Sequence, residues 1–221
     1  MRLMETFTSF LKEEARRLKK PSRKSSIATP FCTICHGRIE DNSWRSTVFD
    51  GNHICQKCFY ALTPIYKRVK QGGLRCLILY DSSPHLNKCL DRVLFQNEKG
   101  VAPALISYCA PFLFTRFHGF TIVPLFEDGA DPNFNVAEAI FKPFGFNVEE
   151  WFEETFNEQK SRVKTVQILK KTAQKPPNRI VLFLCSFNRE KFISAYRELR
   201  KKGVKNIYAI SLRKGGEKPL K

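Results

Sequence analysis

Four cysteines near the N-terminus have the type and spacing of metal ligands. Cys32 and Cys35 form one C-x2-C pair, and Cys55 and Cys58 form a second pair nineteen residues further along the chain. A two-residue gap lets one tight turn direct both sulfurs at one ion, and two such pairs close a tetrahedron around zinc. The pattern therefore predicts a structural zinc site. Because the segment between the pairs is too short to bury its own core, the metal would supply its folding free energy.

Three other interpretations of these pairs stay open. Residues 32–36 also match the C-x-x-C-H motif of covalent haem attachment. Either pair is also compatible with a redox disulfide, and the module is also compatible with a metal-free remnant. His36 and His53 lie beside complete thiolate pairs and are interpreted as spectators. The remaining cysteines have no paired spacing and are expected to be small core residues: Cys76, Cys89, Cys109 and Cys185.

The chain of 221 residues is strongly basic. Lys and Arg number 38 against 21 Asp and Glu, which gives a formal net charge of +17. This charge favours a polyanionic partner: nucleic acid, a phosphorylated ligand or an anionic membrane surface. No apolar stretch approaches the ~20 residues that span a bilayer, and no signal peptide is visible, so we expect a cytoplasmic protein. In that reducing compartment, metal ligation, catalysis or core packing is expected of cysteines, and disulfides are not.

Strand and helix patterns alternate after the cysteine pairs. They predict strands over 74–80, 120–125, 180–185 and 206–212, and a helix over 189–202 closed by Gly203. Strand, basic helix, glycine and strand form a βαβ unit, which implies a parallel sheet with helices on its faces. The acidic run at 149–154 is interpreted as a solvated helix face, and Gly72 and Gly73 as a domain boundary. We therefore predict four segments: a basic amphipathic helix and linker (1–29), a zinc-ribbon-like module (30–72), an α/β domain (73–214) and a basic tail (215–221).

Several short motifs match one protein family in order along the chain. Residues 123–125 (Val-Pro-Leu) resemble its V-P-x-P strand end, and residues 134–138 (Phe-Asn-Val-Ala-Glu) resemble its G-F-N-Q-A-E motif. Residues 155–162 are similar to its T-x-x-Q-x-x-x-S-x-x-R stretch, with shorter spacing. With the four-Cys module in front, the chain resembles the ComF family of bacterial competence proteins. The resemblance implies a type I phosphoribosyltransferase-like fold, a parallel sheet flanked by helices, with single-stranded DNA and a helicase as partners.

The ligand-binding loop implied by this resemblance has lost its characteristic residues. Relatives of this fold carry two acidic residues that contact the ribose of phosphoribosyl pyrophosphate, then a Thr-Thr-Gly loop that cradles its 5′-phosphate. The residues that stand in these places are Cys185 and Ser186, and then Arg189, Glu190 and Lys191. We therefore expect phosphoribosyl transfer to be lost. The residues predict an ordinary strand-to-helix turn, with Ser186 or Asn188 as the helix N-cap.

Positive charge gathers in the second half of the chain, where residues 160–179 contain no acid. Such a surface binds nucleic-acid phosphates without sequence preference, and the alternative interpretation is a solvated face. Aromatic residues near the cysteine module are candidates for stacking on bases: Phe59, Tyr60 and Tyr66. The candidate nucleic-acid contacts are Lys164, Lys170, Lys171, Lys175, Arg179, Arg197 and Arg200.

Three functions follow as hypotheses. The first is a non-catalytic ComF-like protein that binds single-stranded DNA during DNA uptake or a related processing step. The second is a divergent phosphoribosyltransferase that uses phosphoribosyl pyrophosphate through a rebuilt loop. The third is a scaffold whose zinc module docks a protein partner such as a helicase. The missing paired carboxylates favour the first hypothesis over the second.

Overall fold

The computed structural model describes residues 31–32, 34–38, 55–96, 98, 101–126, 136–157, 164–169 and 175–215, with the backbone course of 153–157 and 164–169. The predicted N-terminal helix at 1–29 and residues 216–221 of the predicted basic tail lie outside these residues. The chain divides into two compact units, one ending at Tyr60 and one beginning at Ala61. In the described part of the chain, no helix is long and apolar enough to cross a membrane.

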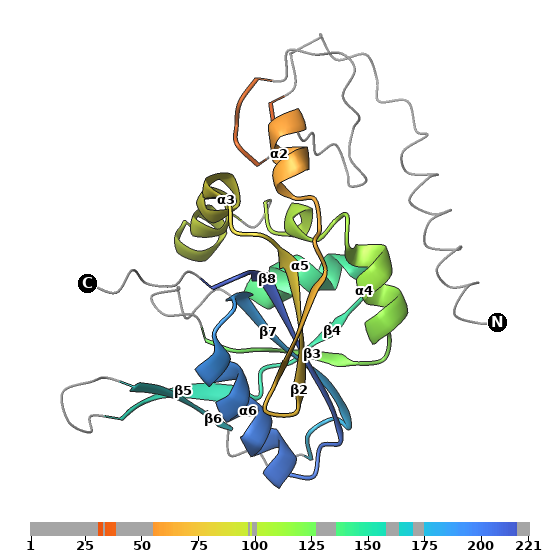
Figure 1. Ribbon diagram of the computed structural model, residues 1–221, viewed down its shortest axis with the longest axis vertical. Helices are drawn as coiled ribbons and strands as arrows, with labels where there is room; N and C mark the ends of the chain where they lie inside the picture. Colours follow the sequence, from red (N-terminus) through yellow and green to blue (C-terminus); the bar gives the residue numbers. More distant parts are fainter. Residues whose placement is uncertain are drawn as a thin grey trace. The chain divides into compact units, whose positions relative to one another are not determined.

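A six-stranded sheet organises the second unit (Figure 1). Its strands are β1 (Lys67–Gln71), β2 (Leu74–Tyr80), β3 (Thr121–Pro124), β4 (Asn147–Val148), β7 (Arg179–Ser186) and β8 (Asn206–Arg213). Their order in space is β1-β2-β8-β7-β3-β4. Strands β1 and β2 pair antiparallel, and the other four pairs are parallel. The prediction of an α/β protein with a mostly parallel sheet is confirmed.

Helices cover both faces of this sheet. Helix α6 (Arg189–Lys201) packs on one face of the sheet. Its Phe192 and Leu199 belong to the same hydrophobic core as Leu182 of β7. Side chains alternate along a strand, so the next residue, Phe183, points to the other face, where its ring lies 4.9 Å from that of Phe141. The remaining elements are α3 (Pro84–Phe95), η1 (Pro103–Leu105), α4 (Ala110–Phe117), α5 (Val136–Phe141), η2 (Lys142–Phe144) and the antiparallel pair β5 (Phe152–Asn157) and β6 (Lys164–Leu169), which lies beside α6 (Figure 1).

Local sequence explains the β7–α6 unit. Residues 180–185 are all buried, as expected of a central strand with helices on both faces. The side chain of Asn188 accepts a hydrogen bond from the backbone N–H of Lys191 at 3.1 Å, so Asn188 and not Ser186 is the N-cap of α6. Gly203, with φ of 83°, follows the helix in the left-handed conformation that glycine favours at this position.

Two local interpretations of the sequence were wrong. Gly72 and Gly73 form the turn of the β1–β2 hairpin, where both have positive φ, and β1 belongs to the sheet, so the sheet begins before residue 73. A two-residue turn of this kind selects two glycines, because both positions need the left-handed region. The acidic run at 149–154 leads into strand β5 and forms no helix, since burial of Trp151 and Phe152 outweighs the helical spacing of the acids.

Candidate functional site

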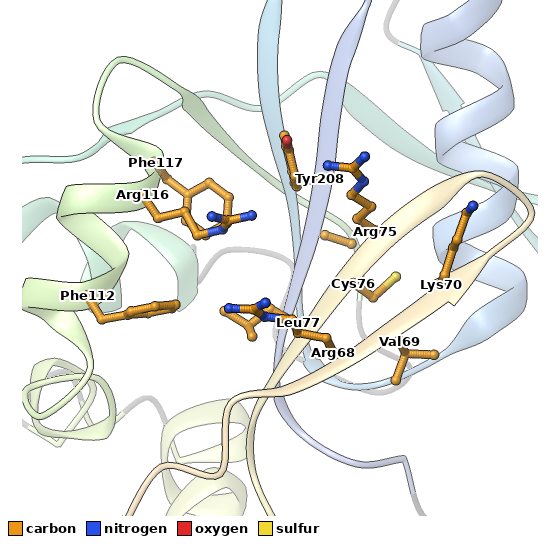
Figure 2. Close-up of a pocket in the computed structure, with 11 residues that line it drawn as sticks. Arg68, Val69, Lys70, Arg75, Cys76, Leu77, Phe112, Arg116, Phe117 and Tyr208 are labelled. Atoms are coloured by element: carbon orange, nitrogen blue, oxygen red, sulfur yellow. The ribbon is translucent and has the colours of Figure 1, made fainter.

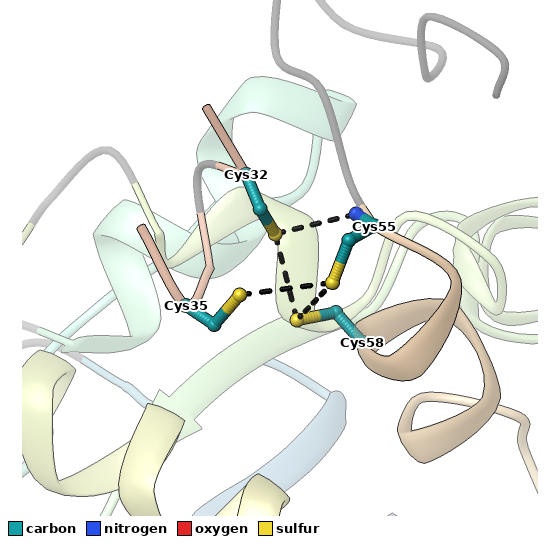
Figure 3. A group of neighbouring side chains, drawn as sticks. All are labelled: Cys32, Cys35, Cys55 and Cys58. Atoms are coloured by element: carbon teal, nitrogen blue, oxygen red, sulfur yellow. Dashed lines mark hydrogen bonds between the residues drawn. The ribbon is translucent and has the colours of Figure 1, made fainter. Parts of the chain in front are cut away.

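The first unit brings the four predicted cysteines together (Figure 3). All four sulfurs lie within 4.8 Å of one another. The closest pairs are Cys55 and Cys58 at 3.4 Å, Cys32 and Cys58 at 3.5 Å, and Cys35 and Cys55 at 3.6 Å. Four sulfurs about 2.3 Å from a central zinc ion stand about 3.8 Å apart. The cluster therefore has the dimensions of a four-thiolate metal site.

Backbone geometry positions the first cysteine pair. An antiparallel bridge joins Phe31 to Arg38, and the N–H of His36 donates to the carbonyl of Cys32 at 2.8 Å. His36 has a φ of 56°, which turns the chain sharply enough for the N–H of Gly37 to reach the Cys35 sulfur at 3.4 Å. This knuckle directs two sulfurs to one side of the loop.

The second pair is positioned by the start of a helix. Cys55 immediately precedes α2 (Gln56–Ala61), and Cys58 lies in its first turn. The backbone N–H of Cys55 donates to the Cys32 sulfur at 3.3 Å, so each pair is tied to the other. Such N–H contacts stabilise negative charge on sulfur.

The electrostatics of the cluster favour deprotonation of one of its members. The hydrogen bond with Cys58 lowers the pKa of Cys32 to about 4. The same contact raises the pKa of Cys58, and burial raises that of Cys35. Negative charge on several sulfurs this close needs a cation between them, which is what a bound metal ion provides.

The other four cysteines are core residues, as predicted. All eight cysteines are free thiols. Cys76, Cys89, Cys109 and Cys185 are each at most 4% exposed. Burial raises the pKa of Cys76 and of Cys109 to about 12. Neutral, inaccessible thiols are poor nucleophiles and poor ligands.

The carboxyl edge of the parallel sheet contains the predicted ligand-loop positions. The chain leaves β3 for β4 on one side and leaves β7 for β8 on the other, so strand order reverses between β3 and β7. In open α/β sheets, ligands bind outside the carboxyl ends of the strands at this reversal. Residues 185–191 lie there, at the end of β7 and the start of α6.

Protein groups already occupy this edge. The Nζ of Lys191 donates to the carbonyl oxygen of Phe126, just beyond the end of β3, at 2.7 Å, and Lys191 is 7% exposed. Next to it, Nε of Arg213 donates to the Ser186 hydroxyl at 2.8 Å, and the same guanidinium bonds the side-chain oxygen of Asn87. The Lys191 contact joins α6 to the segment after β3, and the Arg213 contacts join β8 to β7 and to α3.

Arg189 and Glu190, also predicted at ligand-loop positions, are exposed on the first turn of α6. They line a shallow surface groove with Arg197, Glu198 and Lys201. Charges of both signs alternate along it. With three bases and two acids, the groove has a formal charge of only +1, so it attracts an anion weakly.

The predicted nucleic-acid contacts that the structure describes lie on several different elements. Lys170 and Lys171 lie outside the described residues, and Lys164 begins β6. Lys175 is exposed before β7, Arg179 is exposed at its first residue, and Arg197 is on α6. The guanidinium of Arg200 donates to the carbonyls of Val204 and Lys205 at 3.2 and 3.3 Å, which assigns it to the end of α6.

A basic and aromatic cavity of about 270 Å³ lies elsewhere in the second unit (Figure 2), and its charged and aromatic residues were not predicted from the sequence as a site. Its charged and aromatic lining residues are Arg68, Lys70, Arg75, Arg116, Phe112, Phe117 and Tyr208. The alternation of basic residues in β1 was the available signal, because it puts Arg68 and Lys70 on one face of a strand.

Comparison of the sequence with protein-family models gives no match, and comparison with curated proteins gives no match either. The resemblance to the ComF family therefore stays a prediction that depends on the motifs in the sequence.

Proposed function

We propose that this chain is a non-catalytic, ComF-like protein that binds single-stranded nucleic acid, with DNA uptake or a related DNA-processing step as its setting. The observation that carries the non-catalytic part is the contact of the Lys191 ammonium with the Phe126 carbonyl. This contact lies at the strand-order reversal, the edge at which a phosphoribosyltransferase-like sheet would bind its sugar phosphate.

The chemistry of this edge supports a loss of catalysis. Phosphoribosyl transfer needs groups that hold the ribose hydroxyls and a backbone that wraps the phosphate. Cys185 is buried in β7, and the Ser186 hydroxyl is engaged by Arg213. Between Ser186 and Lys191 no glycine is present, and Glu190 repels an anion. The turn that remains serves to start α6.

Zinc is the metal we propose for the four-cysteine cluster. An all-sulfur, tetrahedral donor set is typical of structural zinc, and its four protein ligands leave no open position for a substrate. The two pairs come from separate segments, residues 32–35 and 55–58, so a bound ion would cross-link them and supply folding free energy to the first unit.

The nucleic-acid part of the proposal is supported by charge. The net charge of +17 on 221 residues attracts a polyanion at long range. Single-stranded binding of this kind depends on phosphate contacts, so affinity falls with salt at a slope of about −0.7 per phosphate contacted.

The experiment is a titration of metal-analysed protein against a labelled single-stranded oligonucleotide at several salt concentrations, with and without phosphoribosyl pyrophosphate. We expect salt-dependent binding of the strand that the small ligand leaves unchanged. Calorimetry with phosphoribosyl pyrophosphate alone should give no saturable heat. Saturable binding of that ligand would overturn the non-catalytic assignment, and absence of any strand binding at low salt would overturn the nucleic-acid assignment.

A further inference from the structure

The cavity beside the β1–β2 hairpin gathers cations without acids. Strands β1, β2 and β8 form its floor, and α4 forms its wall (Figure 2). Arg68, Lys70, Arg75 and Arg116 line it, and no carboxylate is present among the described residues that do so. All four are exposed side chains. Four positive charges around one hollow of about 270 Å³ favour an anionic occupant.

Strand register forces two of these charges together. Lys70 of β1 pairs directly with Arg75 of β2, which in turn pairs with Tyr208 of β8. Like charges directly opposite each other in an antiparallel pair destabilise the sheet. An anion between Lys70 and Arg75 would remove that repulsion. The hairpin therefore bears a local repulsion that a phosphate bound there would relieve.

Aromatic rings line the same hollow. The half-buried ring of Tyr208 lies 5.6 Å from that of Phe117 on α4, which is only 2% exposed and supports Tyr208 from behind. The Arg116 guanidinium lies 6.0 Å from both ring centres. Phe112 lines the wall one turn earlier on α4. Flat rings and a guanidinium plane are the surfaces on which unpaired bases stack.

The aromatic surface continues beyond the cavity. The ring of Phe120 lies 5.7 Å from that of Tyr208, and the guanidinium of Arg179 lies 5.9 Å from the Phe120 ring centre. Arg179 was a candidate nucleic-acid contact from the sequence. Two cations thus flank two neighbouring rings, in the order Arg75, Tyr208, Phe120 and Arg179. Rings for base stacking with basic groups for phosphates on either side are the elements of a single-strand binding surface.

We infer that this cavity is the nucleotide subsite of the protein, with one phosphate between Lys70 and Arg75 and one unpaired base against the α4 wall. The inference rests on the proposed function and names this cavity as the site where the single strand would bind. Because the volume lies just below the range of about 300–1,000 Å³ typical of small-molecule sites, it suits one nucleotide. Bases in a duplex are stacked and paired, so single strands are the ligand that can fill it.

The test compares Lys70→Glu with Lys88→Glu in the full-length, metal-loaded protein. Lys88 is exposed on α3 and outside the cavity, so the two variants make the same change of charge. Lys70→Glu places an acid opposite Arg75 and relieves the repulsion in the hairpin, so the fold is retained. The probe is a fluorescent oligothymidylate at fixed salt, with a duplex of the same length and thymidine 5′-monophosphate as separate arms.

We expect Lys70→Glu to weaken oligothymidylate binding at least tenfold and to reduce the salt slope by about 0.7, while Lys88→Glu changes affinity less than about threefold. Crosslinking of an iodouracil-substituted strand should label the peptides that contain Phe112 or Tyr208. If both variants weaken binding equally, the charge acts diffusely and this inference is overturned while the proposed function stands. If the wild type binds no single strand, both fall. Binding of the monophosphate but not of the strand would likewise overturn the inference, because the site would then take a free nucleotide. Equal binding of the duplex would overturn base stacking.

Discussion

Replacing Lys191 by Met tests how much the hydrogen bond between its ammonium and the Phe126 carbonyl contributes to the stability of the fold. The substitution keeps the apolar stem but removes the donor that lies 2.7 Å from the Phe126 carbonyl. A hydrogen bond from a charged group contributes about 1.5–3 kcal/mol. We expect a loss of about 2 kcal/mol in the free energy of unfolding. For a domain of this size, 1 kcal/mol shifts Tm by about 2–4 °C, so Tm should fall by about 4–8 °C.

The matched control is Lys201→Met, on the same helix. Lys201 pairs with Glu198 at 2.7 Å, but its side chain is 71% exposed, and exposed helical pairs contribute only about 0.3–0.5 kcal/mol. Its Tm should therefore fall by less than about 2 °C. The assay is calorimetric unfolding of the metal-loaded protein at neutral pH, repeated by urea titration. Equal effects of the two substitutions, or a Lys191→Met variant as stable as the wild type, would refute the reasoning.

Two further predictions concern the four-cysteine cluster and the buried thiols of the second unit. Purified protein should contain one zinc per chain, and Cys58→Ser should lower zinc content and expose the first unit to limited proteolysis; full zinc occupancy in this variant would contradict the four-thiolate site. Stability should also decrease as pH rises from about 9 toward 12, since burial raises the pKa of Cys76 and Cys109 to about 12. The unfolded thiols ionise first, so the unfolded chain is favoured over that range. Urea midpoints at pH 8, 9.5 and 11 measure this effect, and Cys76→Ala should reduce the slope; an unchanged slope would argue against it.

The features that sequence predicted correctly are local ones. The run at 180–185 is apolar throughout, and burial on both faces of a parallel sheet requires that composition. The helix after it has its N-cap and its closing glycine within the same short stretch, at Asn188 and Gly203. The cysteine pairs carry their geometry in their spacing, because each loop of two residues sets its own turn.

The features that sequence missed depend on contacts between distant segments. Lys191 was identified as a departure from a ligand loop, but its partner carbonyl at Phe126 lies 65 residues away in the chain. Nothing near either residue indicates that contact. The cavity was missed for the same reason: Lys70, Arg75 and Tyr208 become neighbours only through the register of three strands. Basic runs in the sequence drew attention to other residues, of which Arg200 serves to close its helix.

The two ends of the sheet use positive charge in opposite ways. At the carboxyl edge, Lys191 and Arg213 are bonded to protein oxygens, so their charges are satisfied within the fold. At the opposite end, Arg75 near the start of β2 and its neighbour Tyr208 in β8 face a hollow that is lined by no acid of the described part of the chain. From Tyr208 to Arg213 the strand runs five residues, or about 16 Å at 3.3 Å per residue. One nucleotide cannot bridge that distance. The Lys191 and Arg213 contacts at the carboxyl edge and the proposed binding at the cavity are therefore independent, so Lys191→Met should leave binding of the strand unchanged.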